Sequence, residues 1–365
     1  MASNTSTTRI LQLAETISTS VARIQEVLTS KDLPSPSFKE DALSSLPREA
    51  TDAQNAVLDA TAELRDLLIM DPMLLIHGHG GHNNSLCQQA IAHFGIAAMV
   101  PPGGRVSFAD IARQTPLTEQ DVGRLLRHAM NMRIFYEPEP GMVAHTKASR
   151  ILADSVTNNW LRVGTEEMWA ASTKVVDALK KYPGSQEPNE TGFCIANNTA
   201  VSIYSVLGSN PERAMRFEHA MVAYAGKPEQ SPAYITDHFD WASLGQARSN
   251  MSEANVIFFR WSLRNWADKY CVMALKAQVP VLKPGARIII QDTIMPEPGA
   301  VPLWKEKNAR SADLSLMATF NARERTAADW KTLVEGADPG FVLKSVVEPE
   351  GSALGILEFV WEGKA

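Results

Sequence analysis

Charged residues follow apolar segments in the last third of the chain. Arg264 comes three positions after Asn255–Trp261, whose β-branched and aromatic residues predict a buried parallel strand, and Asp292 ends a second such segment. Open α/β sheets bind ligands beyond the carboxyl ends of their strands, so both residues are candidates for a site. A guanidinium in a water-poor pocket would stabilise negative charge on a carbonyl or quinone-methide oxygen. The simpler alternative is a surface arginine that pairs with Asp268 one helical turn later.

A histidine-rich stretch, "HGHGGHNN" at 77–84, brings His77, His79 and His82 close together in the sequence. Zinc sites use histidine with cysteine or carboxylate ligands, and no Asp, Glu or Cys stands here at ligand spacing. The glycines predict a flexible loop that caps the next helix. We therefore predict no metal site, although one of these histidines could reach a substrate pocket.

Composition excludes several classes of protein. The 365 residues suffice for two domains, and a net charge of −6 argues against a nucleic-acid binder and gives no support for an anionic membrane partner. No apolar run reaches the ~20 residues that cross a bilayer, and the first residues do not resemble a signal peptide. Three scattered cysteines imply no disulfide framework, so the predicted location is the reducing cytoplasm.

The first 150 residues predict a helical domain. Apolar residues spaced by three or four indicate helices at 8–29 and 52–70, and so narrow a stripe usually faces another helix. Within 86–146, two capped helices precede two short strands around "EPEPG", which is the pattern of a winged helix. Such modules often bind DNA, but Glu119, Asp121 and the acidic chain favour a dimerisation role instead.

Residues 151–365 predict a second domain that is helical at first and then alternates between strands and helices. The expected strands and helices of its last third are strand 255–261, helix 266–277, strand 286–292, helices 309–320 and 326–336, and strands 341–348 and 353–362. Alternation of this kind indicates a parallel sheet with helices on its faces. The predicted class is α/β with a mainly α N-terminal part, divided at 1–150 and 151–365.

Five motifs give the chain a family resemblance: "VGTEEMWAAS", "NPERAMRF", "FFRW…NWADKYC", "LKPGARIIIQD" and "SADLSLMATFNARERTAADW". Together they resemble the fungal branch of the plant-type, two-domain O-methyltransferases over almost the whole length. The resemblance implies a homodimer joined through a winged-helix domain. It also implies a Rossmann-like C-terminal domain that binds S-adenosylmethionine and methylates phenols and aromatic polyketides.

One expected segment is missing. Between "FDW" and "FFRW", members of that family carry a glycine-rich loop and an acidic residue that hold the cofactor. Here the chain passes from Leu244 and Gly245 to Asn255 with neither feature. We therefore predict a truncated Rossmann-like sheet without its first three strands and without cofactor-binding residues. Strand 255–261 becomes an edge strand, which we expect residues 222–254 or a partner subunit to cover.

A second motif of that family, which contains its catalytic base, is also replaced. The resemblance places a His-Asp-Trp motif, whose histidine deprotonates the phenol, where this chain has Arg264-Asn265-Trp266. Arginine stays protonated and cannot act as that base. The resemblance gives Glu324 the place of a carboxylate that orients the base, and it places helix 311–321 along the acceptor pocket. We expect four residues to contact substrate, with core packing as their alternative role: Met317, Asn321, Trp261 and Met168.

The predicted function is that of a methyltransferase-like enzyme of fungal secondary metabolism that does not use S-adenosylmethionine. It would promote a cyclisation, dehydration or pericyclic step on a hydrophobic, polyketide-type intermediate. Arg264 would stabilise charge, while Asp292 and Glu324 would orient groups or transfer protons. The simpler alternative for the two acids is an ion pair with Arg323, Arg325 or Arg264. Two alternatives stay open: an S-adenosylmethionine-dependent O-methyltransferase, with a rebuilt cofactor site or an exon lost in gene prediction, and a catalytically dead paralogue that dimerises.

Overall fold

The computed structural model describes residues 8–78, 80–241 and 254–363. The chain divides into two compact units: Met1–Thr165 with Val301–Glu306, and Glu166–Ala300 with Lys307–Ala365. The boundary expected at residue 150 thus falls inside the first unit, and a short segment near residue 300 returns to that unit.

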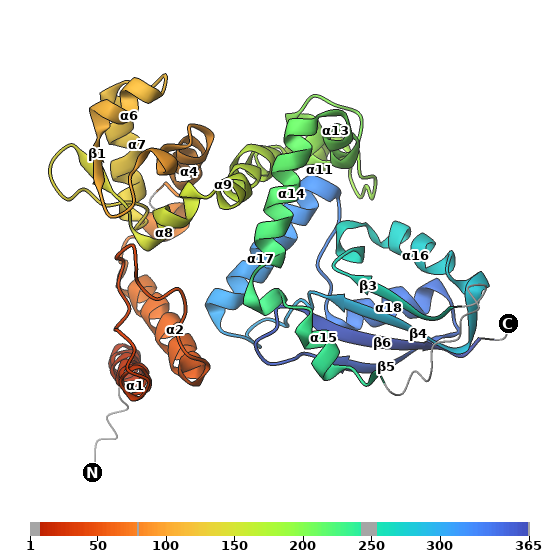
Figure 1. Ribbon diagram of the computed structural model, residues 1–365. Coiled ribbons are helices and arrows are strands. Elements are labelled where there is room, and N and C mark those ends of the chain that lie inside the picture. The colour runs from red at the N-terminus through yellow and green to blue at the C-terminus, as the bar shows by residue number, and fades with distance from the viewer. Residues whose placement is uncertain (1–7, 79, 242–253, 364–365) are drawn as a thin grey trace, which may run out of the picture. The chain divides into compact units, whose positions relative to one another are not determined.

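The first unit is mainly helical. Its α-helices are α1 Arg9–Ser30, α2 Thr51–Leu68, α3 Pro72–His77, α4 His82–His93, α5 Ile96–Met99, α6 Phe108–Gln114, α7 Glu119–Asn131, α8 Lys147–Arg150 and α9 Ser155–Arg162. The long helices α1 and α2 lie side by side, as Figure 1 shows, and they match the two expected at 8–29 and 52–70. The side chains of Ser107 and Thr118 cap α6 and α7 by accepting backbone N–H groups.

The strand pairing of this unit differs from the expected hairpin. Strand β1 (Arg105–Ser107) pairs antiparallel with β2 (Met142–Ala144), while Tyr136 makes only an isolated bridge to Ala144. Arg133 and Phe135 have φ angles of 62° and 64°, which no regular strand allows. The prediction of a first strand before the "EPEPG" turn is therefore wrong.

The second unit has helices both before its first described strand and between its strands. They are α10 Trp169–Ser172, α11 Val175–Lys181, α12 Gly192–Ala196, α13 Ile203–Ser209, α14 Pro211–Ala225, α15 Ala233–His238, α16 Asp268–Lys276 and α18 Ala327–Ala337. The π-helical segment Val163–Met168 and helix α17 (Leu303–Phe320) each have residues in both units. Short 3-10 turns occur at Arg48–Ala50, Ile151–Ala153, Pro228–Gln230, Leu263–Asn265 and Val279–Val281.

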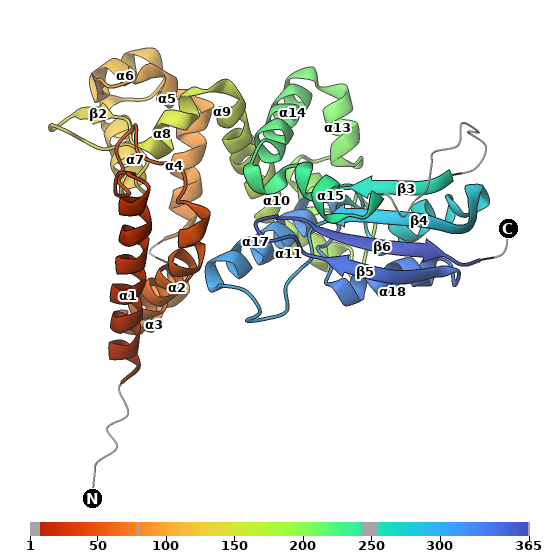
Figure 2. The same cartoon turned by 60° about the horizontal axis from the view of Figure 1, so that its bottom comes forward.

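The sheet of the second unit has four described strands: β3 Ala254–Arg260, β4 Leu282–Asp292, β5 Phe341–Val347 and β6 Gly355–Trp361. Their order is β3-β4-β6-β5, as Figure 2 shows. Only β3 and β4 are parallel, because β6 runs antiparallel to both β4 and β5. Within the described residues β3 lies at one edge of the sheet, with 43% of Phe258 exposed.

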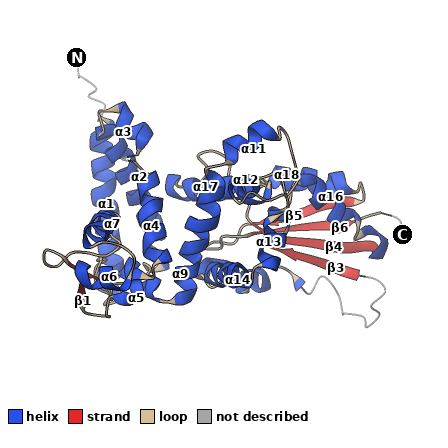
Figure 3. Cartoon of the chain, turned by 90° about the horizontal axis from the view of Figure 1, so that it is seen from above, coloured by secondary structure: helices blue, strands red, loops and turns tan. Residues whose placement is uncertain are grey.

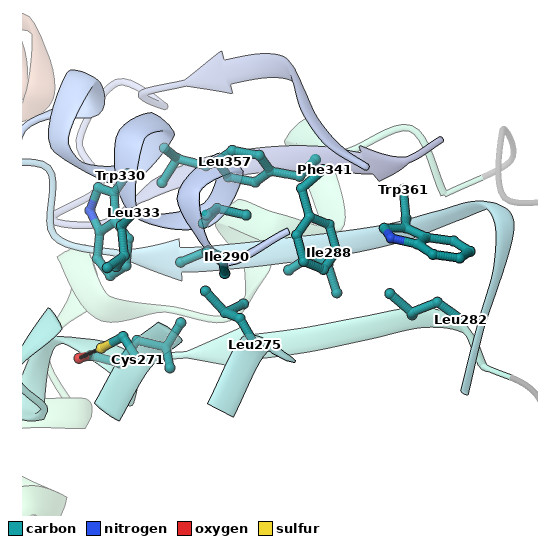
Figure 4. Close-up of a cluster of buried hydrophobic side chains, with 14 of the residues drawn as sticks. Cys271, Leu275, Leu282, Ile288, Ile290, Trp330, Leu333, Phe341, Leu357 and Trp361 are labelled. Carbon is teal, nitrogen blue, oxygen red and sulfur yellow. Dashed lines mark hydrogen bonds between the residues drawn. The ribbon is translucent and has the colours of Figure 1, made fainter. Parts of the chain in front are cut away.

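The sheet buries its two faces against different helices. Ile288 and Ile290 of β4 point to the face that carries α16 and α18, where Cys271, Leu275 and Trp330 complete the core (Figures 3 and 4). The opposite face packs against Ile235 of α15. Residues 222–254 were expected to cover the edge strand β3. Helix α15, which belongs to this segment, packs on a face of the sheet. Residues 242–253 of that segment are outside the described structure.

Candidate active site

The turn that follows β3 places the first site residues. Trp261 has φ 53°, and its backbone N–H donates to the carbonyl oxygen of Gln291 at 2.9 Å. A bulky residue in the left-handed region is strained, so the contact with β4 must hold it there. The 3-10 turn Leu263–Asn265 follows immediately and carries Arg264.

Arg264 forms a buried ion pair with Glu324. The two side chains are 13% and 0% exposed, respectively. The backbone N–H of Glu324 donates to Oδ1 of Asp313 at 2.7 Å, which fixes the carboxylate-bearing segment. The alternative pairing of Arg264 with Asp268 is wrong, because Asp268 pairs with Arg325 at 2.7 Å.

Arg325 anchors this turn and was not anticipated from the sequence. Its side chain is fully buried and donates to the carbonyl oxygens of Leu263 (3.3 Å) and Trp266 (2.8 Å), as well as to Asp268. A buried guanidinium with acceptors on three residues holds both ends of the segment that carries Arg264. The alternation Arg-Glu-Arg at 323–325 showed charged residues, but it did not show which of them is buried.

Two buried carboxyl groups lie close to Arg264. Burial raises the pKa of Asp292 to about 6, and the positive charge of Arg264 opposes this shift. Burial also raises the pKa of Glu324 to about 7, again against the effect of Arg264, while the charges of Asp292 and Asp313 raise it further. Each carboxyl group therefore keeps its proton at pH values well above its ordinary pKa, as groups in proton-transfer sites often do.

A cavity of about 160 Å³ opens beside Arg264, with all its lining residues in the second unit. It is lined by Met168, Phe217, Met221, Tyr224, Trp261, Arg264, Asn265, Ala312, Ser315, Leu316, Thr319 and Phe320. Most of this wall is apolar, with few polar groups, which is typical of a small-molecule site. An apolar cavity of roughly 150 Å³ accommodates a benzene ring, so one aromatic ring fits this space.

Unpaired polar atoms concentrate at the same place. Six buried side-chain polar atoms of the described residues have no hydrogen-bond partner, and four of them belong to this site: Trp261 Nε1, Arg264 Nε, Asp292 Oδ2 and Glu324 Oε2. Buried polar groups are normally hydrogen-bonded, and leaving one unpaired costs about 1–3 kcal/mol. Two of the four atoms are donors on cavity-lining residues, which suits a ligand that brings an oxygen.

The predicted substrate contacts separate into two groups. Met168 and Trp261 line the cavity with Arg264, whereas Met317 and Asn321 line another cavity of about 70 Å³. The Asn321 amide donates to the carbonyl oxygens of Ser185 and Glu187 at 2.9 and 3.2 Å. The cavity-facing positions of α17 are Ala312, Ser315, Leu316, Thr319 and Phe320. These positions lie on the expected helix, whereas Met317 lies on another face of it and Asn321 follows its last residue, Phe320.

Helix α14 supplies cavity residues that the sequence analysis missed. Phe217, Met221 and Tyr224 follow one another at intervals of four and three, so they share a helix face and could have been found from that spacing. Met168 comes from the π-helical segment, a geometry often found at functional sites. An ion pair from Glu166 to Arg216 at 2.8 Å joins that segment to α14.

The histidine-rich stretch shows no ligand geometry in its described part. The Nδ1 atom of His77 accepts the Gly80 backbone N–H at 2.9 Å, and the His77 and His82 rings lie 5.9 Å apart. His79 is outside the described residues. Across 8–78, 80–241 and 254–363, no group of three His, Cys, Asp or Glu side chains could hold a metal ion. No helix of these ranges is long and apolar enough to cross a membrane.

The described residues do not fit S-adenosylmethionine in the way a Rossmann-like site requires. Such a site needs a glycine-rich turn between a strand and a helix. The turn from β3 to α16 contains no glycine, and the segment between β4 and α17 contains Gly299 alone. The junction after Leu244 and Gly245, where the loop was expected, lies outside the described residues.

Known proteins resemble this chain over nearly its full length. A family described as "O-methyltransferase domain" matches residues 212–341. O-methyltransferase PaMT of Phomopsis amygdali is 36% identical, with 97% of this chain and 96% of the relative covered. The solved structure of OxaC with SAH and oxaline has a TM-score of 0.70 at 17% identity, covering 95% and 99% of the two chains. A structure described as "A Pericyclic Reaction enzyme" has a TM-score of 0.67 at 17% identity and covers 95% and 100%.

The alignment with PaMT also measures what this chain lacks. It extends over 413 positions, although only 97% of the 365 residues, about 354, take part. The relative therefore contributes about 59 positions that have no counterpart in this chain. Identity and coverage of this extent establish the family: the chain belongs to the O-methyltransferases, whose fungal members it resembles.

Proposed function

We propose that this chain is an enzyme of fungal secondary metabolism that works without S-adenosylmethionine. It takes an oxygen-bearing, ring-containing intermediate of polyketide type and promotes a cyclisation, dehydration or pericyclic step. The observation that carries the proposal is the state of Arg264. A permanent cation, held by Glu324 and with an unpaired Nε, lines a mostly apolar cavity.

Arg264 supplies electrostatic stabilisation in this mechanism. Negative charge that develops on a substrate oxygen during rearrangement is stabilised by a fixed positive charge in a site that excludes water. The ion pair with Glu324 restricts the guanidinium before substrate arrives, so little reorganisation is needed during the reaction. Because arginine does not give up its proton at neutral pH, the group acts by charge and hydrogen bonding.

Asp292 and Glu324 are the groups that can exchange protons. Their pKa values of about 6 and about 7 mean that both carry protons part of the time near neutral pH. Each has one carboxyl oxygen that no described group satisfies. We assign them to orient Arg264 and to accept or return a proton in steps that need one.

A second candidate function is O-methylation. It is supported by the named activity of the relatives and by the SAH bound to OxaC. The replacement of the expected histidine by Arg264 and the absence of a fitting glycine loop in the described residues favour the cofactor-independent function. A third candidate, a catalytically dead paralogue that dimerises, is supported by the exposed apolar side chains of α1 and α2.

We also propose a homodimer formed through the first unit, with α6, α7 and the β1–β2 pair as its winged-helix-type module. Large apolar side chains are exposed on α1, α2 and α3, among them Leu11 (59%), Leu68 (57%) and Ile76 (80%). Exposed apolar groups in such number are typical of protein–protein contacts. Analytical ultracentrifugation should show a dimer, and a monomer for the variant Leu11→Glu/Leu68→Glu.

Calorimetric titration with S-adenosylmethionine and S-adenosylhomocysteine tests cofactor independence. We expect no heat of binding from a sample that circular dichroism shows to be folded. Micromolar binding of either compound would refute cofactor independence and favour methylation.

The activity itself is tested in a producing strain whose own copy of the gene is deleted. The wild-type chain and Arg264→Met are returned to that strain, with Arg287→Met as a matched control. Arg287 pairs with Glu358 on the sheet and does not line the cavity. We expect Arg264→Met alone to lose the pathway product. If Arg264→Met still gives the same amount of pathway product, the proposed catalytic role is refuted and the dimerising paralogue is favoured.

A further inference from the structure

The indole of Trp261 is a second donor on the wall of the cavity. An indole N–H can donate a hydrogen bond and cannot accept one. Its Nε1 is buried without a partner in the described structure, and the ring lines the cavity. The guanidinium carbon of Arg264 lies 5.7 Å from the centroid of this ring, so the two donors are neighbours.

The backbone around Trp261 holds the indole in that position at a cost. A left-handed conformation costs a residue other than glycine roughly 1–2 kcal/mol. Trp261 adopts it, with φ 53°, and its own N–H is tied to Gln291. Buried tryptophans usually pair the indole N–H as well. A strained backbone and an unpaired donor in one cavity-lining residue point to a ligand contact rather than to packing alone.

The lining limits what can accept these two hydrogen bonds. Phe217, Tyr224 and Phe320 provide aromatic surface, and Met168 and Met221 provide adaptable apolar surface. A ligand that satisfies both donors must bring an acceptor oxygen on a flat, apolar body. A carbonyl conjugated to a ring has this shape and gains negative charge on oxygen as the ring system rearranges.

We propose that Trp261 Nε1–H and Arg264 Nε–H together bind the oxygen of a ring-conjugated carbonyl, which makes Trp261 a second catalytic residue. This inference rests on the function proposed above and narrows its substrate to aryl ketones and cyclic enones. Arg264 contributes charge and one hydrogen bond, and Trp261 contributes a second, uncharged hydrogen bond that fixes where the oxygen lies.

Acetophenone and α-methylstyrene provide a matched pair of probes, because they differ in one position, a carbonyl oxygen against a CH₂ group. Binding is measured by calorimetry for wild type, Trp261→Phe, Arg264→Met and the control Trp266→Phe. Trp266 lies outside the cavity lining and stacks on Tyr204. We expect Trp261→Phe to lose about three- to tenfold in acetophenone affinity, the value of one hydrogen bond, with α-methylstyrene unchanged.

A spectroscopic measurement keeps the test valid if Trp261→Phe fails to fold. In wild-type protein with ¹⁵N-labelled indoles, acetophenone should shift one of the eight tryptophan N–H signals, and α-methylstyrene should not. Equal losses for both probes in Trp261→Phe would assign Trp261 to packing and overturn the inference. So would a wild type that binds acetophenone no better than α-methylstyrene. The proposed function is tested independently of Trp261: it is refuted if a strain carrying Arg264→Met still makes the pathway product.

Discussion

Replacement of Glu324 by glutamine tests the electrostatics on which the site depends. Glutamine has nearly the shape of a protonated glutamate and never ionises. The pKa of Glu324 rises from 4.5 to about 7 in the folded protein because the side chain is buried. The variant therefore represents the protonated state of wild type at every pH.

The expected change in the free energy of unfolding follows from the linkage between proton binding and folding. Since the folded state binds this proton more tightly than the unfolded state, wild-type folding takes up a proton between pH 4.5 and about 7. The contribution of this carboxyl to the free energy of unfolding is therefore most favourable below pH 4.5 and falls as the pH rises through that window. The rise in the pKa of Glu324 from 4.5 to about 7 corresponds to about 3 kcal/mol.

Urea unfolding of wild type and Glu324→Gln, followed by circular dichroism, measures this effect. We expect Glu324→Gln to gain about 3 kcal/mol relative to wild type between about pH 4.5 and about pH 8. Any constant difference between the side chains cancels, because only the change with pH is compared. The control Glu362→Gln removes a carboxyl whose side chain is 53% exposed, so its difference from wild type should stay nearly flat.

Two outcomes would contradict a raised pKa of Glu324. If the difference between wild type and Glu324→Gln is constant over this window, the carboxylate has an ordinary pKa. If the variant instead loses stability as the pH rises, Glu324 is a fully ionised partner that Arg264 stabilises. Either outcome would remove Glu324 as a proton carrier, and it would leave Arg264 with its charge already neutralised.

Three other changes test separate parts of the structure. Arg325→Met should destabilise the fold by about 1–3 kcal/mol in urea unfolding, because it removes the guanidinium donor of the Leu263 and Trp266 carbonyl oxygens. Leu316→Ala should lower the free energy of unfolding by about 2–5 kcal/mol and enlarge the cavity. A larger ketone such as propiophenone should then bind more tightly. The control Met317→Ala should leave ketone binding unchanged, because Met317 lines another cavity. Cys271, fully buried with a pKa raised by burial to about 11, should resist iodoacetamide in the native protein and react after unfolding.

Local signals in the sequence predicted much of the fold. The helices α1 and α2 follow from apolar spacing, and α6 and α7 follow from their caps Ser107 and Thr118. Strand β3 follows from its composition. These features depend on residues close together in the chain, so periodicity and capping chemistry suffice to find them.

Features that depend on distant residues were harder to predict. Strands β5 and β6 were found, but their antiparallel pairing depends on which neighbour each strand meets. In the same way, the apolar residues of α17 occur on several faces of the helix. Spacing could not show that Leu316 lines the cavity while Met317 faces another one.

The replacement at position 264 shows why the residue types alone did not settle the roles in this site. A histidine there would need Glu324 to orient it as a base, whereas Arg264 uses the same carboxylate as an ion-pair partner. One permanent positive charge then lies beside two buried acids, and their raised pKa values show that it does not fully offset the cost of burying them. A carbonyl oxygen bound to Arg264 and Trp261 would use donors that protein groups leave unpaired. The site therefore combines spare donors with protonatable acids, which is a suitable arrangement for rearranging a conjugated carbonyl.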